Sequence, residues 1–328
     1  MVVVIGGFGA VLIVMCLVAP LVGSTRISLA NVFDRSRPFA DNVDAQIFFI
    51  ARLPRVIAAA LVGGALATAG VVFQALLRNP LAAPETLGVS MGASLGAMLA
   101  IAIAPGASVG GISAVTLATL AGSVAALAVV YILSVARSRG MSSTVLLLGG
   151  VVLSTFLGAV ISFVQYLSDF TQTARMIRWL MGSLDVGSYT PIGLALIPLA
   201  LATAGYVTLP RVLDLMSLGP DAASTRGVDV ARAERVALVS ASLSTGAAVS
   251  LAGPIGFLGI VVPHLVRLMV GADHRLVLPG AALFGGAFLI GCDLIGRTAA
   301  APVELPVGIV TAIIGGPFFL WLILKRAR

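Results

Sequence analysis

VIAAALVGGALATAGVVFQALL, residues 56–77, is the segment that decides the fold. It carries no charged side chain and reaches the roughly 20 residues that an α-helix needs to cross the hydrocarbon core of a bilayer. The chain of 328 residues keeps this character throughout, because 59% of its residues are apolar and only 10% are charged. A soluble globular domain carries about 25% charged residues. The composition therefore excludes a soluble enzyme and predicts an all-α polytopic membrane protein.

Ten apolar runs follow one another along the chain and predict about ten transmembrane helices in a single domain, residues 1–328. The runs are Val2–Val22, Val56–Leu77, Leu87–Ala104, Ile112–Val135, Thr144–Leu167, Pro191–Leu209, Val236–Leu251, Ile255–Val270, Leu276–Ile295 and Leu305–Leu324. Only Gly253-Pro254-Ile255-Gly256 separates the seventh run from the eighth, which is typical of a tight reversal between helices. Glycines inside the runs, such as Gly63 and Gly285, are expected to let helices pack closely in lipid.

The topology follows from the number of helices and from the charged ends. An even number of helices places both termini on one side of the membrane. The C-terminal tail, Lys325-Arg326-Ala327-Arg328, is basic, so we expect that side to be cytoplasmic. On this topology residues 24–51 form a periplasmic loop and residues 210–235 form a cytoplasmic loop.

The chain lacks the residues that common catalytic sites require. Its single lysine is Lys325, so it cannot contain the phosphate-binding pattern G-x-x-x-x-G-K-[ST]. His264 and His274 lie apart from any cluster of carboxylates or thiols, which argues against a metal site. The net charge of +7 comes without a basic stripe interleaved with aromatic residues, which argues against nucleic-acid binding. We therefore expect no enzymatic activity, metal or cofactor in this chain.

Carboxylates are scarce inside the predicted spans. The candidates are Asp293, Glu85 and Glu304, all near predicted helix ends, and Arg297 at position i+4 is placed to pair with Asp293. Proton- and ion-driven carriers use such carboxylates although each costs about 2.5–3.5 kcal/mol at the bilayer centre. The scarcity favours a transporter whose energy comes from a separate ATPase. An ion- or proton-coupled secondary transporter acting without an ATPase is the alternative.

One segment between the sixth and seventh spans predicts a short helix outside the membrane. Pro220 suits the first turn of a helix, and Asp221 complements the positive N-terminal end of the helix dipole. Gly227 suits the position that stops a helix. The segment predicts about two helical turns, which serve either as a linker or as a docking helix that passes the motion of a partner to the spans.

Arginines mark the opposite side of the predicted bundle. Arg52 and Arg55 lie where the polar loop enters the second span, and Arg297 lies at the outer end of the ninth. Taken singly, each could extend to lipid headgroups. Taken together, they could form a basic rim that pairs with acidic groups of an extracytoplasmic partner.

Four segments together resemble the FecCD family, the permease subunits of ATP-binding-cassette importers for iron-siderophores, haem and vitamin B12. The segments are Arg52–Gln74 with Asn79–Ala82 and Leu87–Ser90, then Ala223–Val228, then Ala252–Phe257 with Val262–Arg267, and finally Glu304–Gly308 with Gly316–Trp321. Their order and spacing fit from about residue 50 to the end of the chain.

The resemblance implies a function and a set of partners. It implies the vitamin B12/siderophore-type (type II) permease fold, a homodimer in the bacterial cytoplasmic (inner) membrane, and a pathway between the fifth, eighth and tenth spans of the two copies. A periplasmic or lipid-anchored binding protein would deliver a metal chelate (iron-siderophore, haem or corrinoid). Two ATPase subunits would bind ATP and Mg. The residues implied in ATPase coupling are Pro220, Asp221, Ala223, Ser224, Arg226 and Gly227, and those implied in binding-protein docking are Arg52, Arg55 and Arg297.

Overall fold

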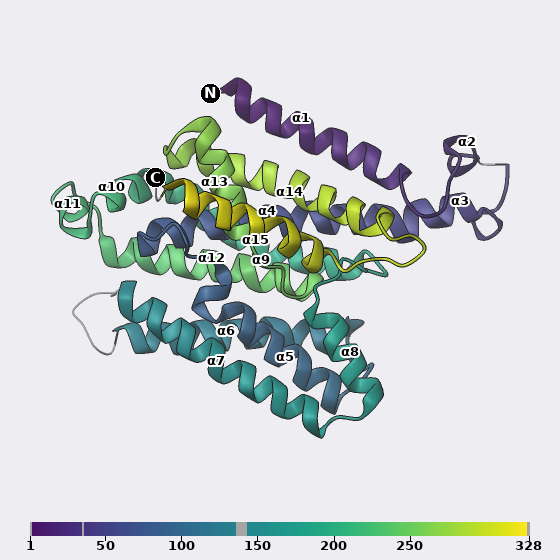
Figure 1. Cartoon of the computed structure of the whole chain (residues 1–328), viewed down its shortest axis with the longest axis horizontal. Helices are drawn as coiled ribbons and strands as arrows, with labels where there is room; N and C mark the ends of the chain where they lie inside the picture. Colours follow the sequence, from purple (N-terminus) through teal and green to yellow (C-terminus); the bar gives the residue numbers. More distant parts are fainter. Residues whose placement is uncertain (1, 35, 136–142, 327–328) are drawn as a thin grey trace.

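The computed structural model describes residues 2–34, 36–135 and 143–326, and this part of the chain is almost entirely helical (Figure 1). The strands in these ranges are β1 (Ser108–Val109) and β2 (Ile112–Ser113), which pair antiparallel as a small hairpin. Two residues of the predicted basic tail, Ala327 and Arg328, lie outside the described residues.

Ten apolar helices in the described ranges correspond to the ten predicted runs. Seven are long and apolar enough to cross a membrane, and three have shorter apolar stretches. The long ones are α1 (Val2–Val18), α4 (Leu53–Leu77), α6 (Ala114–Val135), α7 (Ser143–Leu167), α9 (Thr190–Thr208), α12 (Val230–Ala252) and α14 (His274–Thr298). The others are α5 (Val89–Ile103), α13 (Leu258–Val270) and α15 (Val307–Arg326). The predicted all-α polytopic fold is confirmed.

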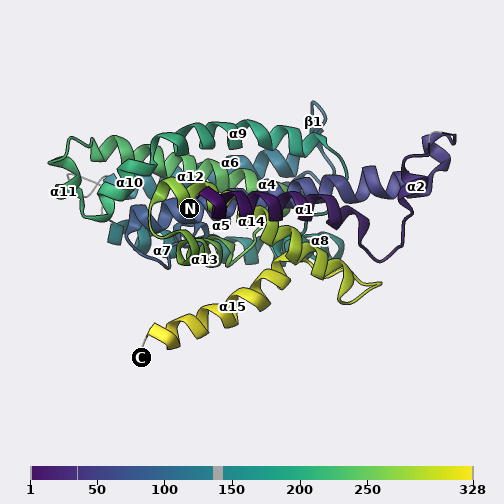
Figure 2. The same ribbon diagram turned by 90° about the horizontal axis from the view of Figure 1, so that it is seen from above.

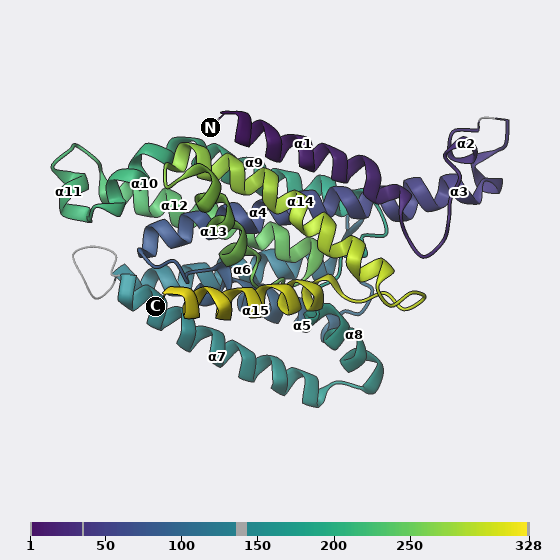
Figure 3. The ribbon, with the colours of Figure 1, turned by 45° about the horizontal axis from the view of Figure 1, so that its top comes forward.

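Helix α4 lies at the centre and packs against α14, α12 and α13 (Figure 3). Glycines set the closeness of these contacts. A Cβ atom added at Gly63 would overlap the main-chain oxygen of Gly285 on α14. A Cβ atom at Gly70 would overlap the main-chain oxygen of Gly259 on α13. The expected role of the glycines in close helix packing is confirmed at these crossings.

A second layer, the lower one in Figure 1, consists of α5, α6, α7 and the amphipathic helix α8 (Phe170–Leu180). Helices α5 and α6 meet through Gly92 and Gly122, where an added Cβ atom would also overlap main-chain atoms. The layer joins the first through α6, which packs against α12. The η4 turn (Pro84–Leu87) connects α4 to α5.

Short helices gather at the two ends of the bundle (Figure 1). One end, here called the α3 end, carries α2 (Leu29–Val32), the 3-10 turn η2 (Phe39–Asp41) and α3 (Val43–Gln46). The other, called the α11 end, carries α10 (Pro210–Ser217) and α11 (Pro220–Ser224).

Two boundaries differ from the predicted spans, each for a local reason. The π-helical turn η3 (Ile47–Arg52) joins α3 to α4 without a break, so the end of the predicted 24–51 loop is helical. Its sequence, IFFIAR, continues the apolar pattern of α4 toward the N-terminus. Helix α12 begins at Val230, before the apolar run starts, because the Asp229 carboxylate accepts a hydrogen bond from the main-chain N–H of Arg232.

The predicted reversal between the seventh and eighth spans is present. Helix α12 ends at Ala252 and α13 begins at Leu258. Gly253 ends α12 with φ 68°, a left-handed conformation that glycine adopts without steric cost. Helix α15, by contrast, leaves the packed body, as Figure 2 shows, and exposes apolar side chains that include Ile313, Leu320 and Trp321.

Candidate functional site

A buried carboxylate on α14 joins the arginines predicted at the α3 end. Asp293 has a side chain that is 0% exposed, and its Oδ1 atom lies 2.8 Å from Arg55 Nε on α4. Its Oδ2 atom lies 3.0 Å from Arg297 Nε, one turn further along α14. Arg55 Nη1 donates a second hydrogen bond to Glu304 Oε2 at 2.5 Å. Asp293 thus links α14 to α4, and Arg55 extends the link to Glu304 in the segment that leads into α15.

Two of the predicted arginines, Arg52 and Arg297, hold the end of α1 in place. Arg52 Nη1 donates to the main-chain oxygen of Pro20 at 3.0 Å, and Arg297 Nη2 donates to that of Ala19 at 3.2 Å. Both acceptors belong to the 3-10 turn η1 (Ala19–Leu21) that follows α1. The turn therefore contributes its carbonyl groups as partners for two buried cations.

The three arginines are brought together, as the sequence suggested, but they face inward. Arg52 and Arg297 are 6% and 3% exposed, so they do not form an open basic rim. The physical reason is that Asp293 pairs with Arg55 and Arg297 inside the bundle, while Arg52 donates to the main-chain oxygen of Pro20. Sequence reasoning found the i,i+4 pair with Arg297 but missed the contact with Arg55, which is 238 residues away.

Glu304 is the solvent-accessible member of this group, since its side chain is 47% exposed. The exposed cations near this end include Arg26 and Arg37, beside the short helices, and Arg175 and Arg178 on α8. The two α8 arginines line a hollow of about 430 Å³. Glu304 and these exposed arginines are therefore more accessible to a partner at this end than Arg52 or Arg297.

At the α11 end, the predicted coupling residues form a short exposed helix. Helix α11 has Gly219 as its N-cap, Pro220 and Asp221 in its first turn, and ends at Ser224, so it is shorter than the predicted two turns. Gly227, the predicted stop, lies three residues beyond the end of the helix, in the turn that follows it, and has φ 81°. Ala223 is fully buried and its carbonyl oxygen accepts from the Val228 N–H at 3.2 Å. The other predicted coupling residues, Pro220, Asp221, Ser224, Arg226 and Gly227, are exposed.

A polar contact ties this end to α14. Asp214 Oδ1 on α10 accepts from the main-chain N–H of His274 at 3.1 Å and lies 2.6 Å from His274 Nδ1. His274 is the first residue of α14, and the 25 residues of α14 extend about 37 Å toward Asp293 and Arg297. Because α14 also packs closely along α4, it is a stiff element that joins the two ends of the bundle.

The pattern that defines the FecCD transport family matches residues 11–325. The chain belongs to the FecCD transport family. Two similar proteins show what other members are named for. This FecCD protein is 43% identical to the cobalamin import system permease protein BtuC of Halobacterium salinarum, over 84% of this chain and 72% of that protein. It is 37% identical to the hemin transport system permease protein HmuU of Yersinia pestis, over 96% of this chain and 93% of that protein.

A solved structure shares the fold. It is described as a metal-chelate type ABC transporter in an inward-facing conformation, and it aligns with a TM-score of 0.84 at 32% sequence identity. The alignment covers 99% of this FecCD protein and 100% of the solved chain. The arrangement of the ten apolar helices is therefore that of a transporter permease.

Proposed function

We propose that this FecCD protein is the permease subunit of an ATP-binding-cassette importer that moves a metal chelate (iron-siderophore, haem or corrinoid) across the bacterial cytoplasmic membrane. The names of the cobalamin and hemin relatives support the substrate class. A substrate-binding protein delivers the chelate, and two ATPase subunits supply the energy. ATP and Mg bind to the ATPases, and this chain holds no cofactor of its own.

The observation that carries the proposal is the exposed helix α11 with its connection to α14. Ala223 anchors α11, so Pro220, Asp221, Ser224, Arg226 and Gly227 are held outward as one rigid surface for the ATPase. Movement of this surface reaches α10 and then α14 through Asp214 and His274. A stiff α14 passes the movement toward the α3 end, which is the coupling that an alternating-access permease requires.

At the α3 end we propose that a carboxylate of the binding protein replaces Glu304 as the partner of Arg55. Glu304 is half exposed and its ion pair is accessible, whereas Asp293 is buried and stays with the arginines. Arg52 and Arg297 then act by holding Arg55 and the α1 end in position. Replacement of one carboxylate by another leaves the charge of the site balanced, so docking avoids stranding a buried cation.

The proposed topology places the α11 end and both termini in the cytoplasm, with residues 24–51 on the periplasmic side of one permease domain, residues 1–328. Two copies form the transporter, with the pathway between α7, α13 and α15 of each. The projecting apolar face of α15 supports this arrangement, because Leu320 and Trp321 are exposed in the single chain and a second copy would cover them.

Reconstitution tests the proposed function. Proteoliposomes that contain the permease and its ATPase, with ATP enclosed at the ATPase face, are given the binding protein and each of three ligands: cyanocobalamin, haem and a ferric siderophore. We expect uptake of one ligand class against its gradient only when ATP and both partners are present. Uphill uptake by the permease alone, driven by an ion gradient, would show that the secondary-transporter alternative is correct.

The docking proposal has its own test. Arg55→Glu should weaken binding of the binding protein, and more strongly at low salt, because the long-range attraction that steers an acidic partner to the site is screened by salt. Glu304→Gln removes the internal competitor for Arg55 and should strengthen binding. Binding that is weakened by Glu304→Gln, or that shows no dependence on salt in Arg55→Glu, contradicts the exchange of carboxylates.

A further inference from the structure

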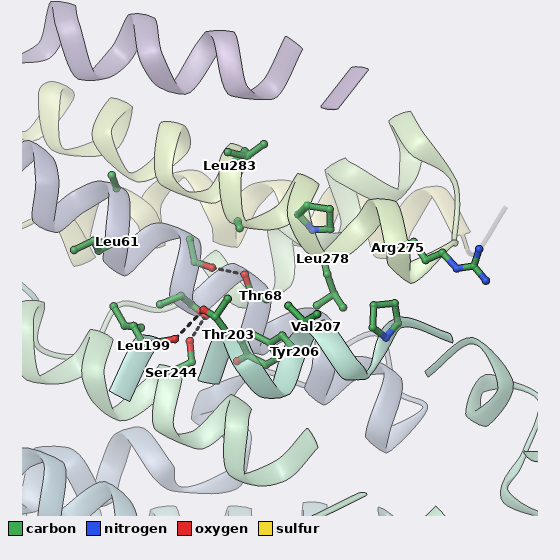
Figure 4. A pocket seen from close by; sticks show the side chains of 16 residues that line it. Leu61, Thr68, Leu199, Thr203, Tyr206, Val207, Ser244, Arg275, Leu278 and Leu283 are labelled. Carbon is green, nitrogen blue, oxygen red and sulfur yellow. Dashed lines mark hydrogen bonds between the residues drawn. The ribbon is translucent and has the colours of Figure 1, made fainter. Parts of the chain in front are cut away.

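A groove of about 540 Å³ lies between α4, α9 and α14, away from the buried arginines of the α3 end. It extends from Leu61 at one end to Arg275 at the other, as Figure 4 shows. Leu199, Val207 and Leu278 form much of its wall. Its volume falls within the roughly 300–1,000 Å³ of pockets that hold small-molecule ligands.

The hydroxyl groups in the groove are already engaged, so its wall presents an apolar surface. Each donates to a main-chain oxygen: Thr68 to Gly64 at 2.6 Å, Thr203 to Leu199 at 2.8 Å, Ser244 to Ala65 at 3.1 Å, and Tyr206 to Ser240 at 3.3 Å. Figure 4 shows hydrogen bonds of this kind as dashed lines at Thr68, Thr203 and Ser244. A polar chelate would find few donors here, whereas a hydrocarbon chain needs none.

The length of the groove corresponds to one leaflet of a bilayer. Its lining on α9 and α10 runs from Leu199 to Pro210, and its lining on α14 runs from Arg275 to Leu283. At 1.5 Å per residue these stretches are roughly 12–17 Å long. Half of the roughly 30 Å hydrocarbon core is the same distance.

The groove opens on a face that is suited to lipid. Helix α9 carries exposed apolar side chains, including Leu196, Ile197 and Leu201. Figure 2 shows α9 and α15 on opposite sides of the body, so this face is remote from the surface proposed to meet the second copy. The occupant that fits this position is therefore a component of the membrane.

A cation lies at one end of the groove. Arg275 is exposed, and its guanidinium extends beyond the apolar lining (Figure 4). The carboxylates nearby, Asp273 and Asp214, accept main-chain hydrogen bonds from Arg275 at 2.9 Å and from His274 at 3.1 Å, and neither forms an ion pair with the Arg275 guanidinium among the described residues. Arg211, next to the groove residue Pro210, is exposed as well and adds positive charge at this end.

We propose that this groove binds one anionic phospholipid of the inner leaflet, with an acyl chain between α4, α9 and α14 and its phosphate on Arg275. The assignment to the inner leaflet rests on the proposed topology, and anionic lipids are attracted there to basic residues. The site lies beside the Asp214–His274 contact, so a bound lipid would brace α10 against α14 on the route from α11.

Native mass spectrometry of the full-length permease in detergent tests the site, with dioleoyl phosphatidylglycerol as the probe. Thr203→Trp fills the groove from α9 and should lower the affinity about tenfold or more, because several methylene groups lose their contacts. Arg275→Gln should lower it about fivefold, and Arg275→Lys should restore most of the loss. Ala204→Trp and Arg232→Gln are matched controls, since both residues are exposed and lie outside the groove lining.

Loss of affinity in Thr203→Trp and Arg275→Gln, with both controls like the wild type, supports the proposal. Val207→Trp, also in the lining, replaces Thr203→Trp should that variant fail to fold. Equal affinity in all variants overturns the proposal, and so does equal binding of dioleoyl phosphatidylcholine. Competition by inorganic phosphate alone would reduce the site to a phosphate contact and also overturn it. A change in oligomeric state in the groove variants would assign the groove to a protein interface instead. None of these outcomes depends on transport activity.

Discussion

Replacing Asp293 with asparagine removes the carboxylate that Arg55 and Arg297 share. The carboxylate is 0% exposed and lies 2.8 Å from Arg55 Nε and 3.0 Å from Arg297 Nε. Removing one member of a buried ion pair costs about 3–5 kcal/mol, because the remaining charge stays buried without a partner. Arg55 retains Glu304, whereas Arg297 retains only the main-chain oxygens of Ala19 and Val22. We therefore expect Asp293→Asn to lose about 3 kcal/mol, the lower end of that range.

Equilibrium unfolding of the purified permease in detergent, followed by tryptophan fluorescence, measures this loss. Glu304→Gln is the matched control, because an ion pair with a half-exposed partner contributes only about 0–1 kcal/mol. The double variant Asp293→Asn/Arg297→Met should be more stable than Asp293→Asn, since it also removes the stranded cation. The reasoning is refuted if Asp293→Asn loses no more than Glu304→Gln, or if the double variant is less stable than the single one.

Three further predictions concern packing, pH and coupling. Gly63→Leu should destabilise the permease by about 1–3 kcal/mol or more in the same unfolding assay, because the larger side chain overpacks the α4–α14 crossing. Gly7→Leu is the control and should be near neutral, because Gly7 has open space around it. Burial raises the pKa of Glu85, in the η4 turn, from 4.5 to about 7, so the folded protein keeps a proton that the unfolded chain releases. The free energy of unfolding should then fall by about 3 kcal/mol as the pH rises from 4.5 to 7, and Glu85→Gln should abolish that fall. If α11 meets the ATPase, Arg226→Glu should reduce the stimulation of ATPase activity by substrate about tenfold or more. Arg232→Glu is the control, because a negative charge in the first turn of α12 is compatible with the helix dipole. Equal stimulation in the two variants contradicts the coupling role.

The helices were predictable because their signals are local. A run such as Val56–Leu77 must be helical in lipid, since each main-chain polar group needs a partner within its own segment. The start of α11 followed from Pro220, and the α12–α13 reversal followed from Gly253 and Pro254. The length of α11 was overestimated, because the return of the chain onto Ala223 depends on burial of that side chain against the bundle.

The amino-acid sequence by itself determined the membrane class, the number of apolar helices and the residues that gather at the two ends. Only the tertiary structure decided which of those residues meet. The contact of Arg55 with Asp293 spans 238 residues, and the groove beneath α9 is built from α4, α9, α12 and α14. Hydrophobic length and helix capping act within a few residues of one another. Ion-pair partners and cavities depend on how far helices approach, and here glycines such as Gly63 and Gly285 set that distance through contacts between segments distant in the chain.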